Sequence, residues 1–215
     1  MEGDVPGGRP AEPGVARSPV AVRPAPLGTL MPARALHHLL RKLRGDGHHT
    51  LPRVSLSEIG WSWLGATLGL SALGALSRVV LVGVDRGLVI GSMGATAVLV
   101  YGAPRSPFAQ PRAVLGGHVV SALVGVACQQ ALPNAPEVAA ALAVSTAIAV
   151  MHLTRTLHPP GGATALIAVI GSAHLKALGF TYALAPVGLG AAVLVGVGLL
   201  VNNLSSGRKY PEAWW

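Results

Sequence analysis

The residues with the clearest chemical potential are a histidine, two prolines and two glycines at positions 158–162, set inside a long apolar stretch. Pro159 and Pro160 lack the amide hydrogen that a helix needs, and the glycines remove side-chain bulk. In the hydrocarbon of a membrane, a break in a helix is tolerated only where protein or a water-filled cavity surrounds it. The break therefore predicts a place where something polar is handled, with His158 beside it.

A helix that opens at residues 161–164 would direct free amide groups at an anion, because helix N-termini bind anions. Arg155 adds positive charge, and His158 would make the affinity depend on pH, since an unperturbed imidazole titrates at about pH 6.5. The alternative is that the prolines simply end one helix and begin the next, a position that suits proline. The predicted substrate site comprises His158, Pro159, Pro160, Gly161, Gly162, Thr164, Gly94, Thr96 and Arg155.

The composition indicates a membrane protein. Of 215 residues, 51% are hydrophobic and 11% are charged, whereas a soluble domain has about 25% charged residues. The first sixty residues hold half of the lysines and arginines, so the net charge of +8 lies mostly in the tails. Aromatic residues are scarce there, so we expect an anionic lipid surface, and not nucleic acid, as the partner of that charge.

The chain divides by composition into three parts. Residues 1–50 are rich in Pro, Gly and Arg and are predicted to be disordered. Residues 51–207 form the predicted transmembrane domain, and residues 208–215 a C-terminal tail at the membrane interface. The expected fold is all-α, a polytopic membrane helix bundle of six apolar segments at 61–84, 88–103, 113–132, 138–157, 161–173 and 182–204. A straight span needs about 20 residues, so the second and fifth segments are short or broken.

The six segments form two triplets with the same long–short–long order. The sequence Gly-Ala-Thr-Ala occurs in the short segment of both triplets, at residues 94–97 and 162–165. Three crossings per triplet would give the halves opposite orientations. We therefore predict an inverted repeat, in which the two short segments meet near the middle of the membrane, as in many transporters.

Charge placement supports six crossings with both termini in the cytoplasm. Cytoplasmic segments usually carry an excess of Lys and Arg. Six crossings place on the inside Arg105, Arg112, Arg155, Arg208 and Lys209, and on the outside Asp85 with Arg86, then Glu137 and Lys176. Four crossings would move Arg105 and Arg112 outside.

The sequence predicts no enzyme, resident metal or cofactor. The acids of the membrane region, Asp85 and Glu137, fall in expected loops, and hydrolase, metalloprotease and phosphate-loop motifs are missing. Cys128 is the single cysteine, which excludes an intrachain disulfide. His118 lies in the third apolar segment, where it either bonds a neighbouring helix or binds a ligand.

The HPPGGAT sequence, together with GATAV, QPRAVLGGH and the C-terminal VNNLS and RKYPEAWW, resembles the HPP family of integral membrane proteins, which is named for its His-Pro-Pro. The family pattern commonly has Ala where Gly161 stands. The resemblance implies transport of a small inorganic anion, with nitrite as the leading substrate, in a bacterial plasma membrane or a plastid inner envelope. It also implies four spans, in contrast to the six expected from charge. A membrane scaffold or sensor subunit is the alternative, and the Gly-rich faces are compatible with a homo-oligomer.

Overall fold

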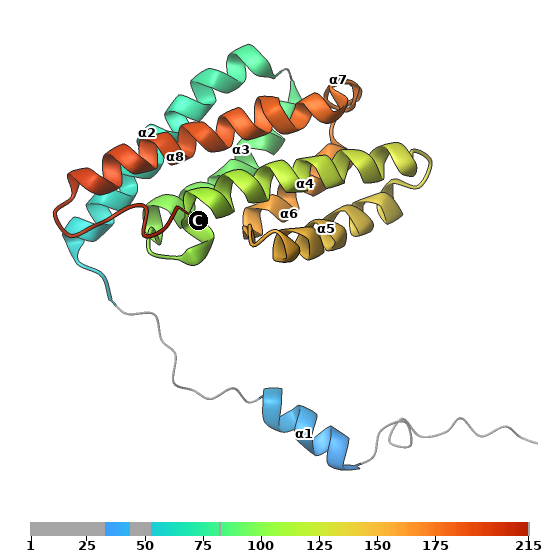
Figure 1. The fold of residues 1–215 in the computed structure, drawn as a ribbon, viewed down its shortest axis with the longest axis horizontal. Helices are drawn as coiled ribbons and strands as arrows, with labels where there is room; N and C mark the ends of the chain where they lie inside the picture. The colour runs from blue at the N-terminus through green and yellow to red at the C-terminus, as the bar shows by residue number, and fades with distance from the viewer. Residues whose placement is uncertain (1–32, 44–52, 82, 215) are drawn as a thin grey trace, which may run out of the picture. The chain divides into compact units, whose positions relative to one another are not determined.

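The computed structural model describes residues 33–43, 53–81 and 83–214, in two units that comprise Met1–Pro52 and Arg53–Trp215. Every regular element in these ranges is helical. The first unit contains α1 (Ala33–Leu43). The second unit is the helical bundle of Figure 1. Its elements are α2 (Leu56–Val80), α3 (Val84–Ala97), η2 (Val98–Gly102), η3 (Pro107–Ala109), α4 (Pro111–Ala131), α5 (Pro136–Leu153), α6 (Pro159–Ile170), α7 (Ala173–Ala177), η4 (Gly179–Ala183), η5 (Leu184–Gly188) and α8 (Leu189–Leu204).

In the described part of the chain, five helices are long and apolar enough to cross a membrane: Leu56–Val80, Val84–Gly102, Pro111–Ala131, Pro136–Thr154 and Gly179–Leu204. A sixth apolar helix, α6, has 12 residues and is therefore about 18 Å long, shorter than a hydrocarbon core of about 30 Å. All six predicted apolar segments thus correspond to helices. The second segment reaches spanning length because the π-helical turn η2 extends α3. The six-crossing count and the inverted repeat stay predictions.

Three prolines begin long helices of the bundle, whereas Pro186 lies at a kink in η5, where Ala185 is not helical. Pro111, Pro136 and Pro159 each occupy the first helical position of α4, α5 and α6, where the missing amide hydrogen has no helical partner to lose. We expected the helix after the break to open at Gly161, but it opens two residues earlier. The prolines at 159 and 160 therefore do what the simpler alternative predicted: they start the next helix.

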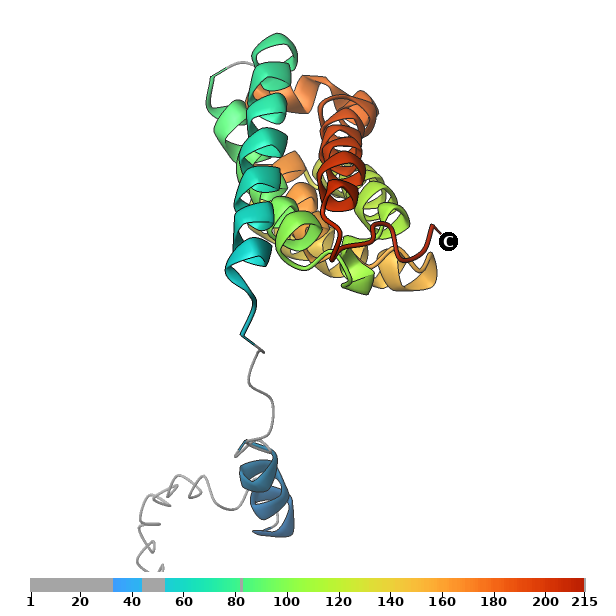
Figure 2. The same cartoon turned by 90° about the vertical axis from the view of Figure 1, so that its left-hand side faces the viewer.

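Three helices form one half of the bundle by close backbone contact. α4 packs on both α5 and α6, and α8 lies beside α4 and α2 in both views (Figures 1 and 2). A Cβ on Gly117 of α4 would lie 2.5 Å from the Cβ of His158, and one on Gly125 would lie 2.5 Å from the carbonyl oxygen of Ala165. Small residues allow this approach in lipid, where packing and not hydrophobicity brings helices together.

A buried arginine joins the other half, and we call its contacts the Arg208 network. The Arg208 Nε lies 2.9 Å from a carboxylate oxygen of Glu58. Its Nη1 donates to the carbonyl oxygen of Tyr101 and to the Asn202 Oδ1, at 3.0 and 2.8 Å. Its Nη2 donates to the hydroxyl of Ser62 and to the carbonyl of Glu58, each at 2.8 Å. The predicted inside charge of Arg208 is thus neutralised within the protein.

The C-terminal segment folds back on the bundle. The Tyr210 hydroxyl donates to the carbonyl of Ala109 at 2.8 Å, and burial raises the pKa of this phenol, which keeps the donor protonated. The side-chain oxygen of Gln110 accepts the backbone amide of Glu212 at 2.8 Å. The sequence predicted an interfacial tail at 208–215; residues 208 and 210 of that tail are instead buried in the bundle, and Trp215 lies outside the described residues.

Helix α1 lies within the segment that composition predicted to be disordered. Its leucines at positions 36, 39, 40 and 43 follow helical spacing and are all exposed, and Arg41 and Lys42 occupy its last turn. The prediction differed here because Pro and Gly in the flanking sequence dominate the average composition. The rest of the predicted tail, 1–32 and 44–50, lies outside the described residues.

Candidate functional site

Five polar side chains meet inside the apolar bundle, and we call them the His–Thr cluster. Three helices supply them: Ser92 and Thr96 come from α3, His118 from α4, and His158 and Thr164 from the start of α6. None of the five is more than 4% exposed. Buried polar groups in a membrane protein are costly and tend to mark functional positions, so this cluster is the candidate site.

Helical spacing and missing side chains together place these residues. Ser92 and Thr96 are one turn apart on the buried face of α3, which also carries Asp85. His158 is the N-cap residue of α6, directly before the two prolines. It fits against α4 because Gly117 has no side chain there. Replacing that glycine would push the whole first turn of α6 away from His118.

Short hydrogen bonds join the five side chains in one continuous line, in the order His158, Thr96, His118, Thr164 and Ser92. The Thr96 Oγ1 lies 2.7 Å from the His118 Nε2 and 2.9 Å from the His158 Nε2. The other ring nitrogen of His118 lies 2.7 Å from the Thr164 Oγ1, which is 2.8 Å from the Ser92 Oγ. The two imidazole rings meet edge to face, with centroids 4.8 Å apart and an interplanar angle of 61°.

Each end of the line meets a backbone carbonyl. The His158 Nδ1 lies 2.8 Å from the carbonyl oxygen of Phe108, in the loop before α4. The Ser92 Oγ lies 3.4 Å from the carbonyl oxygen of Pro160. The cluster therefore consists of neutral hydroxyls, imidazoles and carbonyls, a set that exchanges donors and acceptors by small rotations and proton shifts.

The structure unites some of the predicted site residues and separates others. His158, Thr96 and Thr164 meet through His118, so the two Gly-Ala-Thr-Ala segments do approach each other, as predicted. The remaining predicted residues contribute differently. Gly161 provides close packing, since a Cβ there would lie 2.7 Å from the Ser121 Oγ, and Pro160 contributes its carbonyl.

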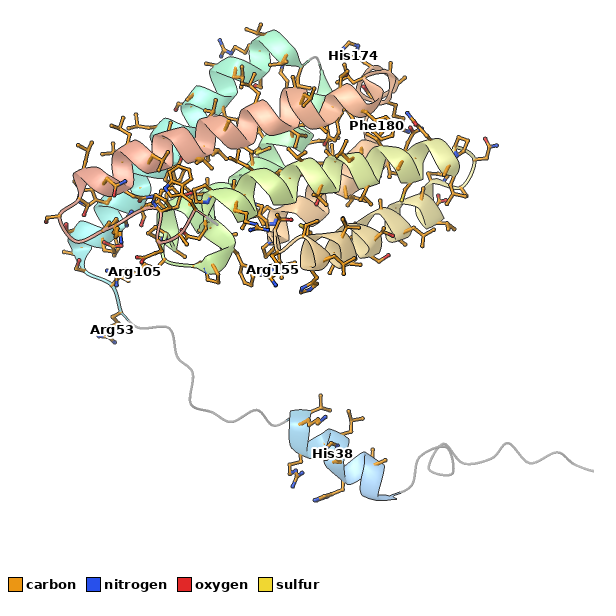
Figure 3. The ribbon with its side chains drawn as sticks, in the orientation of Figure 1. His38, Arg53, Arg105, Arg155, His174 and Phe180 are labelled. Carbon is orange, nitrogen blue, oxygen red and sulfur yellow. The ribbon has the colours of Figure 1, made fainter. Side chains whose placement is uncertain are left out.

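Four predicted residues lie away from the cluster. Arg155 is exposed on the loop between α5 and α6 (Figure 3), and Pro159 is exposed as well. A Cβ on Gly162 would meet Val144 of α5 at 3.6 Å, so this glycine faces another helix. Gly94 lines a pocket against α2. Arg155, Pro159 and Gly162 were placed in the site because they are close to the break in sequence, and Gly94 because it belongs to the repeated segment, but none of the four faces the cluster.

The structure also alters the prediction that free backbone amides at the start of α6 would bind the anion. A helix leaves its first four amide groups without helical partners. At the start of α6 two of these positions are prolines, and the amide of Gly161 donates to the His158 carbonyl at 2.8 Å. Little free amide remains, so any anion in this site would have to be bound by the side chains of the cluster.

Sequence reasoning left Ser92 out of the site and only considered His118. Ser92 precedes Thr96 by four residues in an apolar segment, and that helical spacing was the signal available. The same face holds Asp85, which we expected in an outer loop; it is fully buried in the first turn of α3. Its carboxylate accepts the amide and hydroxyl of Ser172, at 3.0 and 2.5 Å.

A pocket of about 380 Å³ lies at the Arg112 end of α4, and none of the five cluster residues lines it. The pocket is lined by Pro111, Arg112, Leu115, Gly116, Thr156 and Trp214. Among the described residues, no group of three or more His, Cys, Asp or Glu could hold a metal ion.

These features define a polytopic, all-helical membrane protein with a buried polar centre at a proline-started helix. The model of the HPP transmembrane region matches residues 51–211, and the chain belongs to this family. It is 48% identical to a transmembrane protein of Dictyostelium discoideum over 178 residues, which are 81% of this chain and 57% of the relative. A second transmembrane protein of that organism is 42% identical over 179 residues, 81% of this chain and 62% of the relative.

The chain thus spans about three fifths of the length of these relatives. No solved structure matches it. Both relatives are named only as transmembrane proteins, which agrees with the apolar, membrane-spanning helices of this chain.

Proposed function

We propose that this protein is a membrane transporter or channel for a small inorganic anion, with nitrite as the leading substrate. The observation that carries the proposal is the His–Thr cluster, in which two imidazoles and three hydroxyls are buried at the start of α6. Such groups can turn their hydrogens toward a small anion, and a dry site strengthens each of those hydrogen bonds. An anion of two or three atoms needs only a few such donors.

The proposed topology has six crossings in two inverted triplets, with both termini in the cytoplasm. In support, Thr96 and Thr164 hold equivalent places in the two repeated segments and bond opposite nitrogens of His118. A cysteine at Ser106, introduced after Cys128 is replaced, should be labelled only from the cytoplasmic side. Labelling from outside would favour four crossings.

We further propose that the protein lies in a bacterial plasma membrane, with a plastid inner envelope as the alternative, and that it forms a homo-oligomer.

A second candidate, a scaffold or sensor subunit that transports nothing, rests on one observation. All five side chains of the cluster already have hydrogen-bond partners within the protein. A cluster of this kind could hold three helices together without ever binding a ligand. The two candidates therefore differ in whether the cluster opens to an anion.

Nitrite uptake by the purified protein in liposomes tests the proposal. We expect protein-dependent uptake that His158→Ala weakens strongly, because this change removes a ring from the centre of the cluster. His152→Ala is the matched control, since His152 is exposed at the end of α5 and should leave uptake unchanged. If wild-type protein takes up no more nitrite than empty liposomes, the scaffold candidate replaces the transporter.

A further inference from the structure

The hydrogen positions in the His–Thr cluster follow from its contact with Phe108. A carbonyl oxygen only accepts, so the His158 Nδ1 must carry a hydrogen and donate it to Phe108. In a neutral ring the other nitrogen, Nε2, is then an acceptor. Thr96 must therefore donate its single hydroxyl hydrogen to the His158 Nε2.

The same reasoning fixes the rest of the line. Because the Thr96 hydrogen is already used, its oxygen must accept from the His118 Nε2. The Nδ1 of a neutral His118 then accepts from Thr164. The Thr164 oxygen in turn accepts from the hydroxyl of Ser92. With both rings neutral, every hydrogen in the line points the same way, from Ser92 to Phe108.

The same heavy-atom positions also allow the line of hydrogen bonds to hold one more proton. If His118 gains a proton on Nδ1, it donates to the Thr164 oxygen, and Thr164 turns its hydrogen toward Ser92. Ser92 then donates to the carbonyl of Pro160, 3.4 Å away. The hydroxyls of Thr164 and Ser92 change the direction in which they donate. The hydrogen-bonded contacts along the line are kept, and every hydrogen still has an acceptor. The second proline of the His-Pro-Pro sequence supplies the spare acceptor.

The same added proton can also lie on His158. Its Nε2 then donates to Thr96, which turns its own hydrogen toward the His118 Nε2, and the single hydrogen of His118 lies on Nδ1. From His118 to the Pro160 carbonyl the hydrogen bonds are unchanged, so every hydrogen again has an acceptor. The added proton is therefore shared by the two imidazoles through Thr96.

We propose that the His–Thr cluster binds one proton on its two imidazoles together with the transported anion, so that the protein is a proton-coupled anion symporter. This inference rests on the transport function proposed above. A buried imidazolium without a counter-charge is strongly disfavoured in a low-dielectric interior. An anion beside the imidazoles supplies that counter-charge, so each of the two ions favours binding of the other, and the pair crosses as a neutral unit.

The titratable groups around the cluster are engaged elsewhere, which leaves proton binding to the two imidazoles. His118 and His158 face each other edge to ring, and from η4 the Tyr182 hydroxyl donates to the backbone carbonyl of Thr164. On α3, Asp85 is engaged by Ser172. At the ends of α4 and α5, the Arg112 guanidinium donates to the carbonyl of Thr154, and His152 is exposed. Residues 184–204, of η5 and α8, contain no titratable side chain.

Proton movement during nitrite uptake tests the coupling. Liposomes containing the full-length protein and a pH-sensitive dye receive external sodium nitrite, and protein-free liposomes give the background from nitrous acid crossing the lipid. We expect acidification of the lumen, one proton per nitrite, and faster uptake when the outside is acidic. Uptake without acidification above background would overturn the coupling and leave the transport function intact. Absence of uptake would overturn both.

Two variants separate proton binding from structure. Ser92→Ala removes the acceptor that Thr164 needs only in the protonated arrangement, so proton affinity should fall about tenfold and the half-maximal pH of uptake should move about one unit toward acid. His118→Gln combined with His158→Gln keeps a donor and an acceptor at each position but removes both chargeable rings, so the remaining uptake should no longer respond to the pH gradient. Ser121→Ala is the control, since this buried serine on α4 contacts the Met151 sulfur outside the cluster. An unchanged pH profile for Ser92→Ala and for this double variant would contradict the proposal.

Discussion

The Arg208 network and the His–Thr cluster are both buried polar systems, but they are built in different ways. Arg208 has a fixed charge, paired with Glu58 and surrounded by oxygen acceptors at 2.8–3.0 Å. The His–Thr cluster carries no fixed charge, and each of its hydroxyls can either donate or accept. The first therefore joins α2, η2 and the C-terminal segment in a single arrangement. The His–Thr cluster also holds three helices together, but its donors and acceptors can be arranged in more than one way.

The comparison shows that burial of polar groups has two uses in this bundle. A guanidinium cannot lose its proton in a protein and donates in fixed directions, which suits a permanent cross-link. An imidazole gains or loses a proton near neutral pH, which suits a site that changes state. Variants in each region should therefore affect different measurements, and the following predictions run from the largest effect on stability to the smallest.

Arg208→Ala should have the largest effect. It leaves Glu58 without its ion pair and deprives the carbonyl of Tyr101 and the side chain of Asn202 of a donor. Removing one partner of a buried pair lowers stability by about 3–5 kcal/mol. Thermal unfolding of the purified protein in detergent measures this loss, with Lys209→Ala, at an exposed neighbouring cation, as control. Equal midpoints for the two variants would show that the network does not support the fold.

Thr96→Val tests the His–Thr cluster with little change in shape. The hydroxyl joins the two rings, so its removal leaves the His118 Nε2 donor and the His158 Nε2 acceptor without partners. Each unsatisfied buried group costs about 1–3 kcal/mol. We expect a lower unfolding midpoint together with loss of nitrite uptake. The control is Thr181→Val, at an exposed threonine. Loss of stability with normal uptake would assign the cluster a purely structural role.

Gly117→Ala tests the helix contact beneath the cluster. The new methyl group would lie 2.5 Å from the His158 Cβ and 2.7 Å from the carbonyl oxygen of Thr156. Overpacking of this kind costs about 1–3 kcal/mol and should also slow uptake, because it separates the two rings. Gly94→Ala is the matched control, since a Cβ there meets no atom within 4 Å. Both variants can be compared by unfolding and by transport; similar behaviour would exclude Gly117 as a critical contact.

Ser62→Ala should have the smallest effect. It removes one of the acceptors of Arg208, which keeps Glu58, Tyr101 and Asn202 as partners. We expect a loss of about 0.5–1.5 kcal/mol, the net value of one hydrogen bond, and unchanged uptake. Ser145→Ala, at an exposed serine on α5, gives the reference midpoint. A loss as large as that of Arg208→Ala would mean that Ser62, and not the ion pair, holds the network.

The sequence predicted the membrane class, an all-helical fold and the approach of the two Gly-Ala-Thr-Ala segments, whose threonines are joined through His118. Hydropathy and segment length carry those features, because a lipid environment constrains both strongly. The start of α6 was placed two residues late, since proline was interpreted as a break and not as a first helical residue. α1 was not predicted, because averaging over a Pro-rich stretch hides an 11-residue amphipathic helix.

The candidate site was predicted in part. His158, Thr96 and Thr164 were identified from the broken segment and its repeat. Arg155 and Gly162 were included because they are close to the break in sequence, and Gly94 because it begins the repeated segment. In the structure Arg155 is exposed to solvent, Gly94 lies against α2, and Gly162 faces α5. Arg208 was expected as a surface charge of the tail and is buried against Glu58.

The sequence by itself determined that the chain enters the membrane and that it is a family member. Only the tertiary structure decided which polar groups share hydrogen bonds. His118 bonds Thr96 and Thr164, 22 and 46 positions away, and Thr96 bonds His158 across 62 positions. These contacts depend on the close approach of α4 and α6 at Gly117 and Gly161. A sequence pattern gives the face of one helix, whereas the partner of a side chain is set by how tightly two helices pack.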